Sequence, residues 1–200
     1  MARKATGARK EQIIETTRDL IFTRGFSNFT VRTVAGLVGI SEAAVYRHFA
    51  SKEDLLQALL DSLFVPWRQS FNQIASEKSS VAERLVALAA RHIEFLLEKK
   101  LNPMLFFSEA ISPENPGLLK VLQTNLLFFN QLLQSLFKEG AAKKEFAVDL
   151  DVESAAVCFL GIVQASIIRW TVFQSDHLLK EDTIAKVSFF LKQIVKVSVK

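Results

Sequence analysis

Cysteine, proline and glycine are scarce in this chain, which has one cysteine, four prolines and seven glycines among 200 residues. The lone Cys158 excludes an intramolecular disulfide, and its apolar neighbours predict an ordinary buried thiol. So few turn-forming residues, set against 17 phenylalanines, disfavour a turn-rich β-sandwich. The composition instead predicts an all-α fold packed around bulky aromatic side chains.

Long apolar runs are also missing. The longest apolar stretch, Val157–Ile168, is interrupted by Gln164 and Ser166 and is shorter than the roughly 20 residues that a membrane-spanning helix needs. The basic start of the chain is followed by polar residues and Glu11, where a signal peptide needs an apolar run. These features predict a soluble, cytoplasmic protein without a membrane association.

The sequence lacks the usual catalytic and metal-binding patterns. It has three isolated histidines, no glycine-rich phosphate loop after a strand and no nucleophile motif. Metal-ligand spacings such as His-x-x-x-His or Cys-x-x-Cys do not occur. We therefore expect no enzymatic activity, no metal site and no cofactor.

Positive charge is concentrated in the N-terminal quarter. The formal net charge is only +4, but residues 1–50 have eight basic and four acidic side chains, so the whole excess lies there. Residues 1–8 are too polar to bury a core and are predicted to form a disordered basic arm. This distribution indicates a phosphate-containing partner for the N-terminal part of the chain.

Residues 30–56 contain the most informative pattern. An apolar helical pattern that begins at Val31 stops at Gly39, and a second pattern begins directly after Ser41. Thr30 and Ser41 have side-chain oxygens that can cap helix N-termini, and Gly39 can adopt the positive φ of a tight turn. This arrangement predicts a helix-turn-helix, which favours DNA binding over plain packing.

The second helix is predicted to run from about residue 42 to residue 49. Its spacing places Val45 and Phe49 in the core, and Ala43, Ala44, Arg47 and His48 on the opposite face. A further helix is predicted to begin at Lys52, because Ser51 lies three residues before Asp54, as in a capping box.

The segment YRHFASKEDLL after a Gly-Ile-Ser turn resembles the TetR (tetracycline repressor) family of bacterial transcription regulators. The resemblance is close over about the first sixty residues. It implies a helix-turn-helix domain of three helices at residues 1–50 and a larger helical ligand-binding and dimerisation domain at residues 51–200. It also implies a double-stranded DNA operator as partner.

The predicted DNA contacts fall into two groups. The resemblance implies that Tyr46, His48 and Lys52 hold phosphates, whereas the exposed start of the second helix would select bases. Arg47 is a candidate either for bidentate reading of guanine or for a phosphate contact. The full predicted set is Arg32, Thr33, Ser41, Glu42, Ala43, Ala44, Tyr46, Arg47, His48 and Lys52.

Three polar residues, His92, Asn125 and Gln164, interrupt otherwise apolar helical faces. They either satisfy one another and nearby carbonyls in the core, or they converge on an apolar small-molecule pocket. The pocket hypothesis places a ligand site among His92, Phe106, Phe107, Asn125, Phe129, Gln164 and Trp170. The sequence does not identify the ligand.

Small residues recur on one stripe of the helix predicted at about residues 151–173, at Ser154, Cys158, Gly161 and Ala165. Such a stripe lets another helix approach closely, either within the subunit or across a dimer interface. The family resemblance implies a homodimer through the last two helices, and two recognition helices suit a symmetric operator.

The function favoured by these observations is a transcriptional repressor that a small apolar ligand releases from its operator. The alternative is a DNA-bound protein of the same family that recruits a protein partner and has no small-molecule ligand. SEAAVYRHF and the NPGL segment at residues 115–118 are similar to a nucleoid-occlusion division inhibitor, which is why this alternative is retained.

Overall fold

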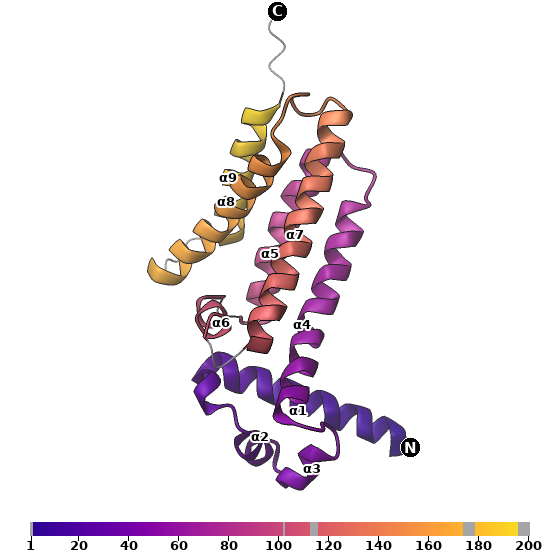
Figure 1. The fold of residues 1–200 in the computed structure, drawn as a ribbon, viewed down its shortest axis with the longest axis vertical. Coiled ribbons are helices and arrows are strands. Elements are labelled where there is room, and N and C mark those ends of the chain that lie inside the picture. Colours follow the sequence, from indigo (N-terminus) through magenta and orange to yellow (C-terminus); the bar gives the residue numbers. More distant parts are fainter. Residues whose placement is uncertain (1, 102, 113–115, 174–178, 196–200) are drawn as a thin grey trace, which may run out of the picture. The chain divides into compact units, whose positions relative to one another are not determined.

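A computed structural model describes residues 2–101, 103–112, 116–173 and 179–195 (Figure 1). The chain divides into two compact units, Met1–Pro66 and Trp67–Lys200. All regular elements in the described ranges are helices, which confirms the all-α prediction. The sequence placed the domain boundary at residues 50 and 51, whereas the boundary between the compact units lies inside a continuous helix, directly after Pro66.

The first unit contains the short helices of the predicted helix-turn-helix. Its elements are α1 (Ala2–Arg24), the 3-10 helix η1 (Phe26–Asn28), α2 (Val31–Val38), α3 (Glu42–Tyr46) and the beginning of α4 (Lys52–Ala75). Because α1 begins at Ala2, the prediction of a disordered arm at residues 1–8 was wrong. Alanine, lysine and arginine dominate that segment, and all three are strong helix formers.

Local capping explains why α2 and α3 begin and end where they do. The Thr30 hydroxyl accepts a hydrogen bond from the Thr33 amide at 3.0 Å, and the Ser41 hydroxyl accepts one from the Ala44 amide at 3.2 Å. Between them Gly39 adopts the left-handed conformation with φ of 74°. A side chain is strained in that conformation, so glycine suits the turn. The predicted helix-turn-helix is confirmed.

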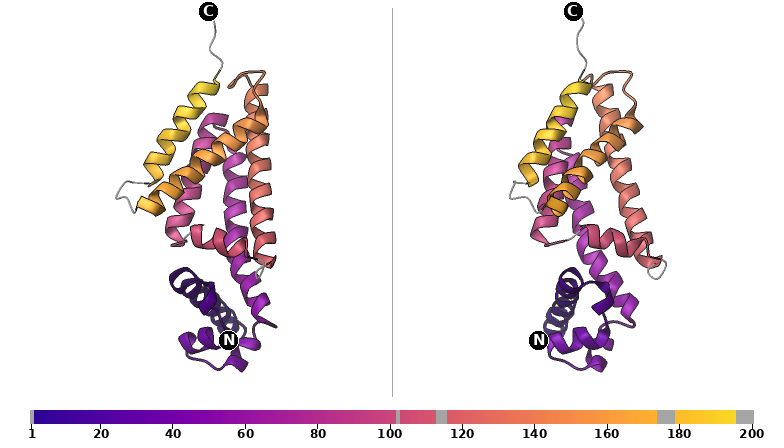
Figure 2. Two further views of the ribbon diagram at one scale, coloured as in Figure 1. Left: turned by 60° about the vertical axis from the view of Figure 1, so that its left-hand side comes forward. Right: turned by 90° about the vertical axis from the view of Figure 1, so that its left-hand side faces the viewer.

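The second unit is a bundle of helices. It contains the rest of α4 with α5 (Val81–Glu98), α6 (Pro103–Ala110), α7 (Pro116–Ala142), α8 (Val152–Phe173) and α9 (Leu179–Ile194). Helix α5 packs against α7 and α9, and α8 packs against α7 and α9. Figure 2 shows α8 and α9 running side by side. The two helices predicted to form the dimer interface are therefore neighbours.

Two local features determine the structure at the end of the bundle that contains the start of α5. Ser80 and Glu83 form a reciprocal capping box at the start of α5. Near the end of α7, a Cβ atom on Gly140 would lie 2.4 Å from the ring of Phe146, which is fully buried. Only glycine leaves room for this ring, so the chain can turn back tightly onto α7.

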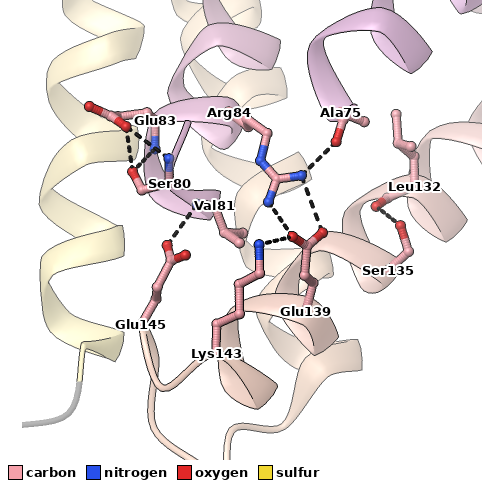
Figure 3. Close-up of polar contacts among 10 residues, drawn as sticks. All are labelled: Ala75, Ser80, Val81, Glu83, Arg84, Leu132, Ser135, Glu139, Lys143 and Glu145. Atoms are coloured by element: carbon pink, nitrogen blue, oxygen red, sulfur yellow. Dashed lines mark hydrogen bonds and ion pairs between the residues drawn. The ribbon is translucent and has the colours of Figure 1, made fainter. Parts of the chain in front are cut away.

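A buried charge lies close to the same end of the bundle (Figure 3). The Arg84 side chain is 3% exposed and donates to both carboxylate oxygens of Glu139, at 2.5 and 3.2 Å. It also donates to the Ala75 carbonyl at 2.5 Å, and Lys143 lies 2.7 Å from Glu139. Hydrogen bonds, first from Arg84 and then from Lys143, lower the pKa of Glu139 to about 2. Arg84 thereby ties the end of α4 to α7.

Candidate nucleic-acid interface and ligand site

The recognition helix α3 is shorter than predicted and presents a narrower face. Ala43 is exposed and Glu42 is half-buried, but Ala44 is only 9% exposed. The prediction that Ala44 lies on the contact face was therefore wrong. Helix α2 packs against α3, and a small residue at this position allows that approach.

The polar residues that follow Ala44 lie at the end of α3 and beyond it. Tyr46 is 49% exposed, Arg47 is exposed and His48 is half-buried. The helix ends at Tyr46, so Arg47 and His48 lie in the turn after it, with the His48 amide bonded to the Val45 carbonyl at 2.8 Å. Their roles in DNA binding stay predictions.

Lys52 begins α4, and its side chain is exposed. Its ammonium nitrogen lies 5.0 Å from the centroid of the Phe29 ring, within range of a cation–π interaction. Ser51 accepts a hydrogen bond from the Asp54 amide at 3.0 Å, which confirms the predicted cap. The cap fixes the first turn of α4, and the aromatic contact restrains the end of the lysine side chain.

Arg32 on α2 and Glu42 on α3 form an ion pair across the turn. The Nε of Arg32 donates to Oε1 of Glu42 at 2.9 Å. This hydrogen bond, and then the charge of Glu42, raises the pKa of Arg32 above its usual value. Thr33, also on α2, is half-buried, and its hydroxyl lies 2.8 Å from that of Thr30. The exposed surface of the first unit thus includes the guanidinium of Arg32, held by the carboxylate of Glu42.

An aromatic cluster surrounds His92 in the second unit. The imidazole stacks on Phe129 of α7, with centroids 5.7 Å apart, and meets Trp67 and Phe71 of α4 edge-on at 5.9 and 6.2 Å. Its Nδ1 atom is buried and has no hydrogen-bond partner among the described residues. Burial lowers the pKa of His92 to about 4. The ring is neutral at physiological pH.

Asn125 belongs to a different interaction from the one that the pocket hypothesis assumed. Its Oδ1 accepts a hydrogen bond from Arg68 at 2.7 Å, and its Nδ2 donates to the Val121 carbonyl at 2.8 Å. Asn125 is therefore satisfied by α4 and by its own helix. Arg68 is a partner that the sequence analysis missed.

The other predicted wall residues lie on two helices that contact each other. Phe106 is buried and Phe107 half-buried on α6, and Gln164 and Trp170 are half-buried on α8. Their convergence with His92 stays a prediction. Sequence reasoning also missed Trp67 and Phe71 as neighbours of His92, although their separation of four residues places both on one face of a helix.

Asn130 on α7 also has a buried polar atom to which no described residue donates. Its Oδ1 is buried and accepts no hydrogen bond from the residues that the structure describes. The helix places it one residue after Phe129, the ring on which His92 stacks. Both α5 and α7 therefore have a buried polar atom, His92 Nδ1 and Asn130 Oδ1, whose hydrogen-bonding capacity is unused by the described part of the chain.

The stripe of small residues on α8 is exposed within one chain. A Cβ atom on Gly161 would have no neighbour within 4 Å, and Cys158 is exposed. The prediction that Cys158 is buried was therefore wrong for the single chain. Both C-terminal helices also expose large apolar residues, since Phe173 on α8 and Phe189 on α9 are 73% and 67% exposed.

Helix α8 is also the one described helix that is long and apolar enough to cross a membrane. Length and composition are the only grounds for this, and 28% of its most apolar 18-residue stretch is buried inside the bundle. Core helices of soluble proteins can be equally long and apolar. Within the described ranges, no group of three or more histidine, cysteine, aspartate or glutamate side chains is arranged to hold a metal ion.

The fold and the exposed helix-turn-helix define a class: an all-helical, DNA-binding regulator with a separate helical unit. The profile of the bacterial regulatory proteins of the tetR family matches residues 13–59, and that of the tetracyclin repressor-like C-terminal domain matches residues 78–186. The chain belongs to the TetR family of transcriptional regulators. Members of this family are soluble DNA-binding proteins and are not enzymes.

Relatives and solved structures agree with this assignment over most of the chain. The nucleoid occlusion factor SlmA of Vibrio atlanticus is 28% identical over 187 residues, covering 85% of this chain and 87% of that protein. The fatty acid metabolism regulator protein of Bacillus subtilis is 23% identical, covering 92% of both. The structure of the Bacillus subtilis regulator FadR in complex with stearoyl-CoA matches with a TM-score of 0.71 at 21% identity, covering 93% of this chain and 97% of that one.

Proposed function

We propose that this protein is a homodimeric, cytoplasmic repressor that leaves its operator when a small molecule with a long apolar part binds in the second unit. The observation that carries the ligand proposal is His92, whose Nδ1 is buried without a described partner inside an aromatic cluster. Leaving a buried polar atom unsatisfied costs about 1 to 3 kcal/mol. A ligand that hydrogen-bonds to this atom and packs on the aromatic rings would remove that cost.

An acyl-CoA is the first ligand class to test. An acyl chain would enter among the buried apolar rings around His92, and Nδ1 would satisfy one polar group of the ligand. Two of the similar proteins are a fatty acid metabolism regulator and a regulator solved with stearoyl-CoA. Their likeness to this chain motivates the choice of probe.

The test needs an operator, which wild-type protein can select from a library of randomised duplex DNA. Stearoyl-CoA is then titrated against the protein–operator complex, with free coenzyme A and stearate as controls. We expect release by stearoyl-CoA, and we expect His92→Leu to keep operator binding but to need more ligand for release. Normal release from a His92→Leu protein of lowered stability would show that His92 only satisfies the core.

The dimer proposal is supported by the exposed apolar surface of α8 and α9. Phe173, Phe189 and the open position at Gly161 lie on these two adjacent helices. A soluble monomer rarely leaves such a surface uncovered. Pairing of the two helices with those of a second copy would cover it and would place two recognition helices on one operator.

A nucleoid-occlusion role is a second candidate, favoured by the 28% identity with SlmA. It predicts that the operator-bound protein retains a protein partner and that acyl-CoA has no effect on DNA binding. Pull-down with operator-bound protein, beside the stearoyl-CoA titration, separates the two functions. Of the NPGL segment that suggested this role, Asn115 lies outside the described residues.

A further inference from the structure

The ion pair between Arg32 and Glu42 joins α2 to α3 at an exposed site. The side chains are 86% and 42% exposed, yet Nε and Oε1 lie 2.9 Å apart. Exposed ion pairs contribute only about 0 to 1 kcal/mol to stability, because ordering two long side chains offsets the attraction. Stabilising the fold is therefore a weak explanation for the pair.

Glu42 accepts a hydrogen bond from Nε of Arg32, which leaves the edge formed by the two terminal nitrogens of the guanidinium available. A guanidinium is planar and has five N–H donors, of which Nε has one and the terminal nitrogens have four. Within the described chain, the structure records a hydrogen bond from Nε and none from the two terminal nitrogens. Two parallel N–H groups of a planar guanidinium match O6 and N7 of guanine in the major groove.

The two backbones that hold this pair are well fixed. Arg32 is the second residue of α2, whose start is capped by Thr30, and Glu42 is the first residue of α3, whose start is capped by Ser41. A buried valine precedes Arg32 directly and another lies three residues after Glu42, with Val31 at 6% and Val45 at 1% exposure. The carboxylate therefore stands on a rigid frame and can restrict the plane of the guanidinium.

We propose that Glu42 is a positioning residue, which holds Arg32 so that its two terminal nitrogens read one guanine of the operator. The proposal rests on the DNA-binding function of the family. It makes the pair, one residue from each helix, a single unit of sequence recognition. Glu42 itself then contacts no base, and its negative charge is neutralised by Arg32 at the DNA surface.

The test uses the operator selected by wild-type protein and a series of duplexes with each base pair replaced in turn. Arg32→Ala should reduce discrimination at one G·C pair by about 10- to 100-fold and elsewhere little. Glu42→Ala should lose much of the discrimination at the same pair, and the double variant should resemble Arg32→Ala. Glu42→Gln, which keeps an acceptor oxygen, should retain most of it.

Two further variants separate positioning from charge and folding. Arg32→Lys keeps the charge without the planar fork, so it should lose discrimination at the same base pair. Asp19 forms another exposed ion pair of the first unit, with Arg18. Asp19→Ala removes that carboxylate and should leave the discrimination at every base pair unchanged. Circular dichroism melts establish that each variant is folded.

Three outcomes would overturn the proposal. If Glu42→Ala raised the affinity for all duplexes equally and left the discrimination at each base pair unchanged, Glu42 would only repel phosphates. Lost discrimination at a base pair different from that of Arg32→Ala would show that Glu42 reads a base directly. A uniform loss with Arg32→Ala would make Arg32 a phosphate contact. Failure to select any operator would instead contradict the DNA-binding function itself.

Discussion

His92 stacks on Phe129, with ring centroids 5.7 Å apart and ring planes inclined by 22°. The contact joins α5 to α7 and places a titratable ring where ionisation is unfavourable, since burial lowers the pKa of His92 to about 4. The residue as a whole is half-buried, but its Nδ1 is buried, so a charge on the ring would lose hydration there.

The first prediction concerns the pH dependence of stability. The folded pKa of His92 lies near 4 and the ordinary value is 6.5, so between these pH values the unfolded chain binds more protons. The free energy of unfolding should therefore fall as the pH falls through this window, by on the order of 2 to 3 kcal/mol from His92 alone. Urea unfolding of wild-type and His92→Phe protein at constant ionic strength measures the difference. Identical pH slopes in the two proteins would contradict the buried, neutral state.

The second prediction concerns the buried guanidinium of Arg84. Glu139→Gln removes the carboxylate but leaves Arg84 charged and 3% exposed, so we expect a loss of about 1 to 3 kcal/mol in the free energy of unfolding. Arg91→Met on the same helix is the matched control, since its ion pairs are more exposed and should be worth about 1 kcal/mol or less. Chemical denaturation at neutral pH measures both. Equal losses would show that burial does not set the importance of the Arg84 pair.

Protonation of Glu139 should remove the stabilising contribution of the Arg84–Glu139 pair at low pH. Its pKa is lowered from 4.5 to about 2, so its contribution is fully present above pH 4.5 and is lost as the pH falls towards 2. Wild-type protein should lose more stability than Glu139→Gln across that range. If the free energy of unfolding fell equally with pH in the two proteins, the Glu139 carboxylate would behave as a solvated group.

The third prediction concerns Lys52 and phosphate binding. If its ammonium group contacts one phosphate per subunit, Lys52→Ala should weaken binding to all sequences alike and make the salt dependence shallower by about one unit of log slope per contact. Lys78→Ala, in an exposed loop of the second unit, is the control and should leave the slope unchanged. Operator titrations at several salt concentrations measure this, and an unchanged slope for Lys52→Ala would exclude the phosphate contact.

Local chemistry in the sequence was sufficient to predict the starts of α2, α3 and α4. Thr30, Ser41 and Ser51 each cap the helix that was expected from their position. These signals depend on residues a few positions apart, so a single sequence contains all the necessary information.

Contacts between distant segments could not be predicted in the same way. Arg68 pairs with Asn125 across 57 positions, and Ala44 is buried in the unit in which α2 packs against α3. Cys158 was predicted to be buried because apolar residues surround it in sequence, yet it lies on the exposed face of α8. Periodicity shows that a helix has an apolar face but not which surface covers that face.

The last prediction concerns the surface that contains Cys158 and Gly161. Gly161→Leu should abolish or weaken the dimer, because the added side chain enters the space where a partner helix would approach. The helical fold should survive, since a Cβ atom at this position meets no neighbour within its own chain. Sedimentation shows the oligomeric state, circular dichroism shows helix content, and Gln131→Leu on exposed α7 surface is the control. Operator affinity should fall together with dimerisation, because each half-site would bind one recognition helix alone. A folded Gly161→Leu protein that remains a dimer would place the interface elsewhere.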